Sequence, residues 1–177
     1  MLDAQPCPAI FVRKDGHGLR RTFGDLHRRY TAHINARNRL TSHLWQARFG
    51  SVAMDEDHLI AAIRYVALNP VRAGLVGRPE DWPWSSVRAH LAGRDDCAVT
   101  VAPVLERVGR FDAFLGESFD AVSGYAPLRV SETTGRPVGS EDWIRQLEKA
   151  FVRPLAPRKR GPKLQQENME VAAALFS

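Results

Sequence analysis

The segment MDEDHLIAAIRYVALNPVRAGLV, residues 54–76, constrains the fold most strongly, because it carries signals for both the start and the end of one helix. Asp55 is a favourable N-cap residue, and the two acidic residues after it suit the positive end of a helix dipole. A buried stripe recurs at helical spacing at Leu59, Ile63 and Val66. Pro70 disfavours helical geometry at the preceding residue, so we expect the helix to end at Asn69. A short helical turn can then resume and stop at Gly74.

Three more helices follow from periodicity and capping residues. From about residue 19 to residue 38, apolar residues recur in steps of three and four while arginines fill the other face. Ser85 or Ser86 can cap a short helix, and Ser140 can cap a final amphipathic helix. Between the first two helices, HLWQARFGSVAM at residues 43–54 is rich in Trp, Phe and Val, which predicts a strand or an extended segment.

Charge is the clearest compositional signal. The chain has 177 residues and a net charge of +5, which indicates a polyanionic partner. Arginines dominate a basic cluster within residues 13–48, and a second cluster is RPLAPRKRGPK at residues 153–163. The planar guanidinium of arginine forms bidentate hydrogen bonds with phosphate, which the ammonium group of lysine does not. We therefore favour nucleic acid as the partner, and the alternative is a solvated basic surface.

The sequence gives no sign of a membrane or secretory protein. No apolar run approaches the roughly 18 residues of a membrane span. The N-terminus has an early acidic residue and lacks the apolar core of a secretory signal. We therefore expect a cytoplasmic location and no membrane partner.

Tyr65 and Asn69 are the residues that suggest chemistry, because they stand four apart on one predicted helix and project from the same face. A tyrosine hydroxyl can attack a phosphate if a metal neutralises the charge and the geometry is in line. An asparagine carboxamide oxygen is a suitable ligand for Mg²⁺ or Mn²⁺. The alternative is a half-buried tyrosine followed by an ordinary Asn-Pro helix end.

Four tryptophans offer a second kind of contact with nucleic acid. The rings of Trp45, Trp82, Trp84 and Trp143 could stack on unpaired bases. For Trp45 and Trp84 the alternative is an anchor in the core or in an interface, and Trp82 beside Pro83 suits a corner of the chain.

Three stretches resemble a known family. GDLHRRYTAHINARN and SHLWQARFGSVAMDEDHLIAAIRYVALNPVRAGLVGRPEDWPWSSVRAHLAG are similar to the bacterial REP-associated tyrosine transposases, relatives of the IS200/IS605 single-strand transposases. The combination of LWQ-RF, RY---NPVRAGLV and WPWSS is specific to it. The stretch TGRPVGSEDWIRQLEKAFVRPLAPRKRGPK also resembles the C-terminal region of many of these proteins. Together these stretches cover well over half of the chain.

The resemblance implies an α+β fold that is mostly helical in this chain. Residues 1–93 would be the catalytic-tyrosine half of a ferredoxin-like transposase domain, without its first strands. Residues 94–139 would form a helical connector, and residues 140–177 a C-terminal helix with a basic DNA-binding tail. The chain would then be the C-terminal half to two-thirds of a transposase, from a truncated or decayed gene.

The resemblance also assigns roles. Tyr65 would be the nucleophile that cleaves and transfers single-stranded or hairpin DNA in transposition, leaving a 5′-phosphotyrosine link and a free 3′-hydroxyl. Asn69 would complete a site for Mg²⁺ or Mn²⁺. Arg48, Arg64 and Arg72 would lie near the DNA path. The basic tail adds five further DNA-binding candidates, namely Arg153, Arg158, Lys159, Arg160 and Lys163.

One departure from the family bears on activity. The family holds its metal with two histidines that flank one apolar residue, on a strand before the arginine-rich helix. No two of the six histidines in this chain stand two residues apart. We therefore expect this chain alone to bind no metal ion and to be inactive as an enzyme.

Two alternatives to an active transposase stay open. One is a catalytically dead DNA-binding remnant, and the other is a regulator of the helix-turn-helix type that uses the C-terminal helices. The family contains both dimers and monomers, so a homodimer also stays open.

Overall fold

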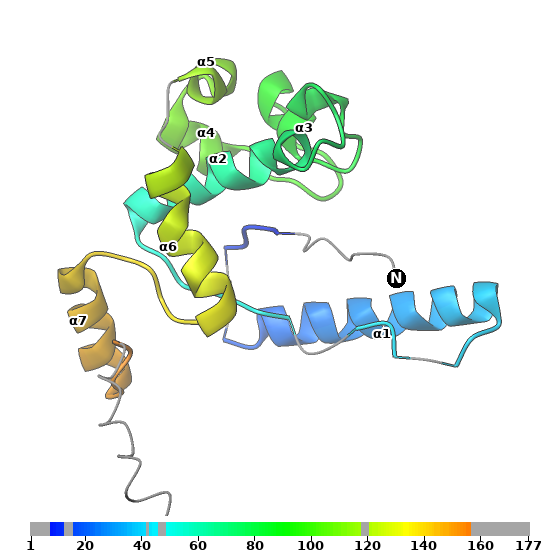
Figure 1. The fold of residues 1–177 in the computed structure, drawn as a ribbon, viewed down its shortest axis with the longest axis horizontal. Coiled ribbons are helices and arrows are strands. Elements are labelled where there is room, and N and C mark those ends of the chain that lie inside the picture. Colours follow the sequence, from blue (N-terminus) through cyan, green and yellow to red (C-terminus); the bar gives the residue numbers. More distant parts are fainter. Residues whose placement is uncertain (1–7, 13–15, 42, 46–48, 118–120, 157–177) are drawn as a thin grey trace, which may run out of the picture.

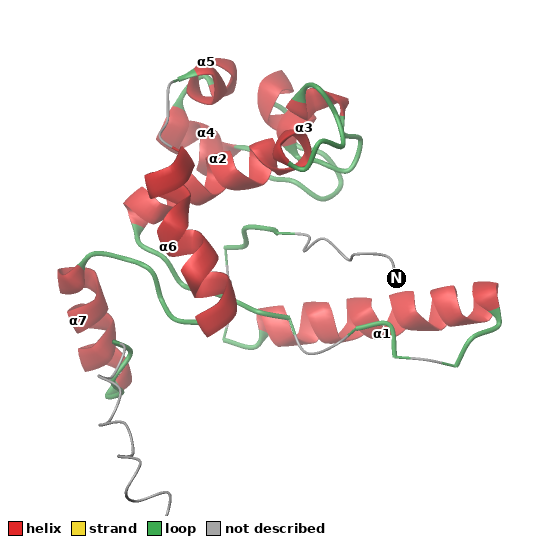
Figure 2. Ribbon diagram, in the orientation of Figure 1, coloured by secondary structure: helices red, strands yellow, loops and turns green. Residues whose placement is uncertain are grey.

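The computed structural model describes residues 8–12, 16–41, 43–45, 49–117 and 121–156, and this part of the chain is mostly helical (Figure 2). Its elements in chain order are α1 (Gly18–Asn38), α2 (Glu56–Arg72), the short 3₁₀ helix η1 (Pro79–Asp81), α3 (Val87–Ala92), α4 (Ala102–Val108), α5 (Phe111–Gly116), α6 (Ala121–Thr134) and α7 (Glu141–Phe151). The prediction of a mostly helical chain is confirmed.

Of the two forms expected for residues 43–54, a strand or an extended segment, the strand is not formed at the positions that the structure describes. Residues 43–45 and 49–53 have no strand, and Met54 makes only an isolated parallel bridge with Val138. A strand needs a neighbouring strand to satisfy its backbone groups. No such neighbour lies among the described residues, so residues 43–45 and 49–53 run as loop.

The helix starts predicted at Asp55 and at Ser140 are both correct. The Asp55 carboxylate accepts a hydrogen bond from the His58 N–H at 3.1 Å and so caps α2. Ser140 Oγ accepts from the Trp143 N–H at 3.3 Å and caps α7 in the same way. Each cap satisfies a backbone donor that the first turn of a helix leaves without a partner.

The predicted end of α2 is wrong, because the helix continues through Pro70 to Arg72. Proline in a helix removes one backbone donor, but the donors beyond it can still bond. Here the Ala73 N–H bonds to the Asn69 carbonyl at 2.9 Å, and the Leu75 N–H bonds to the Pro70 carbonyl at 2.9 Å. Gly74 adopts φ +69°, which confirms it as the residue where the chain turns away.

Helix α2 is the centre of the packing. One of its sides contributes Ile63 and Ala67 to a core cluster that is completed by Val87, Phe111 and Phe114 from α3 and α5. Its other side contributes Ala62 to a second cluster with Tyr125 and Leu128 of α6. Figure 1 shows α2 between these helices, with α6 crossing it. Residues on opposite sides of α2 therefore meet different neighbours.

Helix α1 lies apart from this core. It is 21 residues long and has no buried residue. In Figure 1 it runs along one edge of the molecule, away from α3, α4 and α5. No helix in the described residues is long and apolar enough to cross a membrane.

Candidate functional site

Tyr65 lies in the middle of α2 and is half-buried against α6. Its ring meets the ring of Tyr125 edge to face, with centroids 5.1 Å apart and planes at 78°. Tyr125 itself is 1% exposed. The edge-to-face contact and the packing against the cluster of Ala62, Tyr125 and Leu128 place the Tyr65 ring at the rim of the core.

Arg72, two helical turns after Tyr65, covers the tyrosine ring. Its guanidinium carbon is 4.1 Å from the centroid of the Tyr65 ring and 5.2 Å from that of Tyr125. The guanidinium also donates to the Tyr65 backbone carbonyl at 3.4 Å. Arg72 is exposed, so the two rings carry a cation on their solvent side. An anion that approaches Tyr65 would meet Arg72.

The electrostatics of the pair favour a neutral Tyr125. Burial raises the pKa of the Tyr125 phenol above its ordinary value of 10.0, and the positive charges of Arg72 and Arg64 offset part of that rise. Tyr125 therefore stays protonated at neutral pH and supports Tyr65 by packing. Tyr125 was missed by sequence reasoning, because nothing in the local pattern SGYAP indicates that it meets α2.

Arg64 differs from Arg72 although both stand on α2. Arg64 is 5% exposed, and its guanidinium donates to the Glu117 carboxylate at 3.0 Å and to the Glu117 carbonyl at 3.2 Å. It also lies 4.1 Å from the centre of the Phe114 ring. The structure thus places Arg64 inside the protein, where it attaches α2 to the end of α5, and not on the surface that Arg72 shares with Tyr65.

The metal site implied by the resemblance does not fit the residues around Asn69. Asn69 is half-buried one turn after Tyr65 and offers one neutral oxygen. Among the described residues, no group of three or more His, Cys, Asp or Glu side chains could hold a metal ion. The His58 ring, which precedes Tyr65 on α2, bonds through Nδ1 to the Asp55 carboxylate at 2.6 Å.

The remaining predicted DNA contacts are scattered or outside the described residues. Arg153 is exposed just after α7, where its N–H bonds to the Glu148 carbonyl at 3.2 Å. Arg48, Arg158, Lys159, Arg160 and Lys163 lie outside the described residues. Of the residues selected from the sequence, the structure brings together Tyr65, Asn69 and Arg72.

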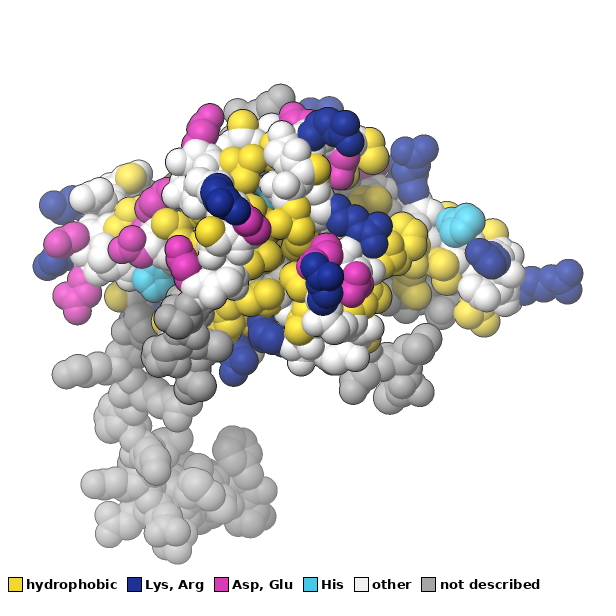
Figure 3. All heavy atoms as spheres, turned by 90° about the horizontal axis from the view of Figure 1, so that it is seen from above, with side chains coloured by type: hydrophobic (Ala, Val, Ile, Leu, Met, Phe, Trp, Pro, Cys, Tyr) yellow, Lys and Arg dark blue, Asp and Glu magenta, His cyan; other side chains and the backbone are white. Residues whose placement is uncertain are grey.

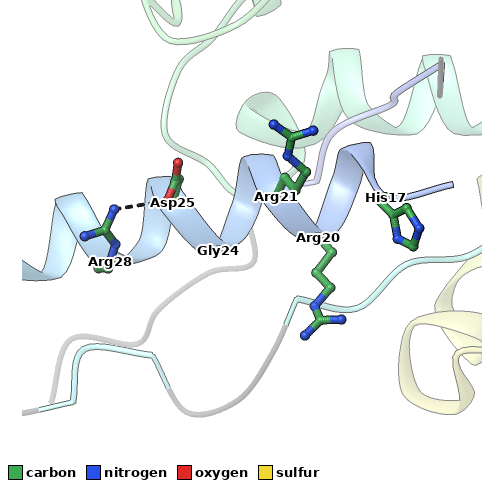
Figure 4. A pocket seen from close by; sticks show the side chains of 6 residues that line it. All are labelled: His17, Arg20, Arg21, Gly24, Asp25 and Arg28. Atoms are coloured by element: carbon green, nitrogen blue, oxygen red, sulfur yellow. Dashed lines mark hydrogen bonds and ion pairs between the residues drawn. The ribbon is translucent and has the colours of Figure 1, made fainter. Parts of the chain in front are cut away.

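A second basic surface, on α1, was not selected residue by residue from the sequence. It is a shallow hollow of about 510 Å³, lined by His17, Arg20, Arg21, Gly24, Asp25 and Arg28 (Figure 4). We call it the basic groove. Arg28 pairs with Asp25 at 3.1 Å. Figure 3 shows Arg and His side chains at the right-hand end of the molecule, where α1 lies, and no acidic side chain there in this view.

The two tryptophans expected as core or interface anchors are not part of the core. Trp84 is 84% exposed and Trp45 is 42% exposed. Trp45 instead rests on α1, where its ring stacks on His27 with centroids 4.1 Å apart. Its indole N–H donates to the His27 carbonyl at 3.4 Å.

Comparison with known proteins gives no family assignment. No protein-family model matches the chain, and no curated protein and no solved structure gives a significant match. The transposase resemblance therefore rests on the quoted motifs, and its functional consequences are proposals.

Proposed function

We propose that this chain is a DNA-binding protein of the REP-associated tyrosine transposase type, which holds single-stranded or hairpin DNA against the Tyr65 face of α2. The observation that carries the proposal is the contact between Tyr65 and the exposed Arg72, 4.1 Å from ring centroid to guanidinium carbon. A phosphate that pairs with Arg72 would lie beside Tyr65. The net charge of +5 favours the same kind of partner.

The proposal extends to the fold and the location. We interpret the described helices as the C-terminal part of a ferredoxin-like transposase domain with a basic C-terminal region. A cytoplasmic location follows from the proposed DNA partner.

The chemistry that the resemblance implies is a transfer of a phosphoryl group. The Tyr65 oxygen would attack the phosphorus of a phosphodiester, the bond from phosphorus to the 3′-oxygen would break, and the 3′-oxygen would take up a proton. Mg²⁺ or Mn²⁺ supplies charge neutralisation for this step in the family, and among the described residues no group of three or more His, Cys, Asp or Glu side chains could hold such an ion. We therefore propose that the chain by itself binds DNA without cleaving it.

The test separates binding from chemistry. A labelled DNA hairpin with single-stranded flanks is titrated with the purified chain, and fluorescence anisotropy is compared with that of a plain duplex of the same mass. The same hairpin is incubated with Mg²⁺ or Mn²⁺ and run on a denaturing gel. We expect the hairpin to bind more tightly than the duplex and to give no covalent band.

Three results would contradict the proposal. Equal competition by plain duplex would remove the preference for unpaired DNA and favour the helix-turn-helix alternative. A covalent band that disappears in Tyr65→Phe would show that the chain cleaves DNA and that another group holds the metal ion. A band that persists in Tyr65→Phe would assign the chemistry to a different residue.

A further inference from the structure

Helix α1 carries a row of ring contacts along one face. Phe23 stacks on Phe49 with centroids 4.7 Å apart and meets Phe11 edge to face at 5.2 Å. Further along the same face, the rings of His27 and Trp45 are nearly parallel, at 14°. The aromatic row consists of Phe11, Phe23, Phe49, His27, Trp45 and Tyr30, whose ring lies 5.9 Å from Trp45.

Much of the aromatic row faces solvent. The exposed fractions are 52% for Phe11, 47% for Tyr30 and 42% for Trp45. Leu26, on α1, and Leu40, just after it, are also exposed. A contiguous exposed apolar surface of this kind marks an interaction site more often than an isolated apolar residue does.

The basic groove adjoins this row on the same helix. Arg20, Gly24 and Arg28 recur every four residues, so they line up along α1 on the side next to Phe23 and His27. A Cβ atom added at Gly24 would meet no other atom within 4 Å, so the centre of the groove is open. Figure 4 shows the Arg20 and Arg21 side chains pointing to opposite sides of α1, next to Gly24.

We infer that α1 is a docking surface for single-stranded nucleic acid, in which the basic groove binds the phosphates and the aromatic row stacks on unpaired bases. This inference rests on the proposed function, because it names where the DNA lies beyond Tyr65. Proteins that bind single strands combine a cationic track for the backbone with aromatic rings for the bases. The two features lie side by side on α1.

The charge on α1 argues against a second copy of the chain as the occupant. Two copies that met through their aromatic rows would bring their basic grooves together, and Asp25 is the acidic residue that lines each groove. Like charges close together oppose association. A polyanion with flat apolar bases instead complements both parts of the surface.

The first test removes the indole ring of Trp45, the one tryptophan of the aromatic row. Anisotropy of a fluorescein-labelled oligo(dT) strand is measured with the full chain and with Trp45→Ala and Trp45→Phe. We expect Trp45→Ala to raise the Kd about tenfold, which corresponds to the loss of stacking on one base, and Trp45→Phe to restore much of the affinity. A circular dichroism spectrum checks that each variant is folded.

The second test neutralises the groove and does not depend on Trp45. In the variant Arg20→Gln/Arg21→Gln/Arg28→Gln, the slope of log K against log salt should flatten by about 2, at roughly 0.7 per phosphate contact. The matched control, Arg94→Gln/Arg129→Gln/Arg136→Gln, removes three exposed arginines elsewhere and should leave the slope nearly unchanged. If Trp45→Ala fails to fold, the comparison of the groove variant with its control still tests whether α1 binds nucleic acid.

The outcomes separate the two proposals. No binding by the unaltered chain would overturn both the proposed function and this inference. Binding that responds equally to the groove variant and to its control would overturn this inference alone. Sedimentation showing a dimer that Trp45→Ala dissociates, with no change in DNA affinity, would assign the aromatic row to a second copy and also overturn it.

Discussion

The Asp55 carboxylate accepts a hydrogen bond from the backbone N–H of Ser140 at 2.7 Å, across 85 residues of chain. Its other oxygen accepts from the His58 N–H, so one side chain joins the first turn of α2 to the start of α7. Gly139, just before Ser140, permits this approach, because a Cβ there would lie 2.3 Å from the Trp143 ring. The contact between α2 and α7 therefore depends on Asp55, which the sequence indicates only as the N-cap of α2.

Asp55→Ala should destabilise the protein more than the loss of an ordinary cap does. Loss of the cap costs about 1 kcal/mol, and loss of the hydrogen bond from the exposed Ser140 N–H adds about 0.5–1.5 kcal/mol. Asp55→Asn keeps an acceptor oxygen and should cost less. Urea unfolding followed by circular dichroism measures both, and equal values for the two variants would show that the Ser140 bond contributes nothing.

Protonation of the Asp55 carboxylate should lower the stability of the protein in acid. Burial alone would raise the pKa of Asp55, but the hydrogen bonds from His58 and Ser140 outweigh it and hold the pKa below 3.8. A depressed folded pKa means that the unfolded chain binds the proton first, so this stabilisation is present above pH 3.8 and is lost as the pH falls through the folded value. The difference in the free energy of unfolding between the wild type and Asp55→Ala should be smaller at pH 3 than at pH 5. A constant difference between them would rule this out.

His90 should add a separate pH dependence at milder pH. Its ring is 8% exposed and packs 4.9 Å from the Phe111 ring, and Nδ1 is buried without a hydrogen-bond partner among the described residues. Burial lowers the pKa of His90 below 6.5, and the charge of Asp96 offsets part of this. The unfolded chain therefore takes up the proton first, and stability should decline as the pH falls below 6.5. Melting temperatures at pH 7.5 and 5.5 should differ less in His90→Phe than in the wild type, and an unaltered difference would refute the assignment.

Arg64 and Arg72 form a matched pair of variants on one helix. Arg64→Met should lower the free energy of unfolding by about 1–3 kcal/mol, because the bonds to Glu117 and the contact with Phe114 are lost. DNA affinity of the folded variant should not change. Arg72→Met should do the reverse, with little effect on stability and a salt slope flatter by about 0.7. Urea unfolding and anisotropy on both variants check this, and a loss of affinity in Arg64→Met would place Arg64 at the DNA.

The sequence by itself determined the features that depend on neighbouring residues. Asp55 and Ser140 cap helices in any context, because the cap needs only the next three residues. The period of apolar residues was sufficient to locate α1, and Gly74 to locate the turn after α2. The prediction that α2 ends at Asn69 was wrong, because the rule for the residue before a proline considers only the local backbone. Burial of Pro70 and Ala67 in the packed helix outweighs the one hydrogen bond that proline removes.

Only the tertiary structure decided which side chains face solvent and which distant residues meet. Tyr125 reaches Tyr65 because α6 crosses α2, and no spacing along the chain encodes that contact. Arg64 and Arg72 are the same residue type on the same helix. Arg64 is buried because α5 ends beside it, and Arg72 is exposed because it lies over the two tyrosine rings at the rim. Helical period fixes the direction of a side chain around the axis, but the elements packed on each side decide whether that direction leads to the core or to a partner.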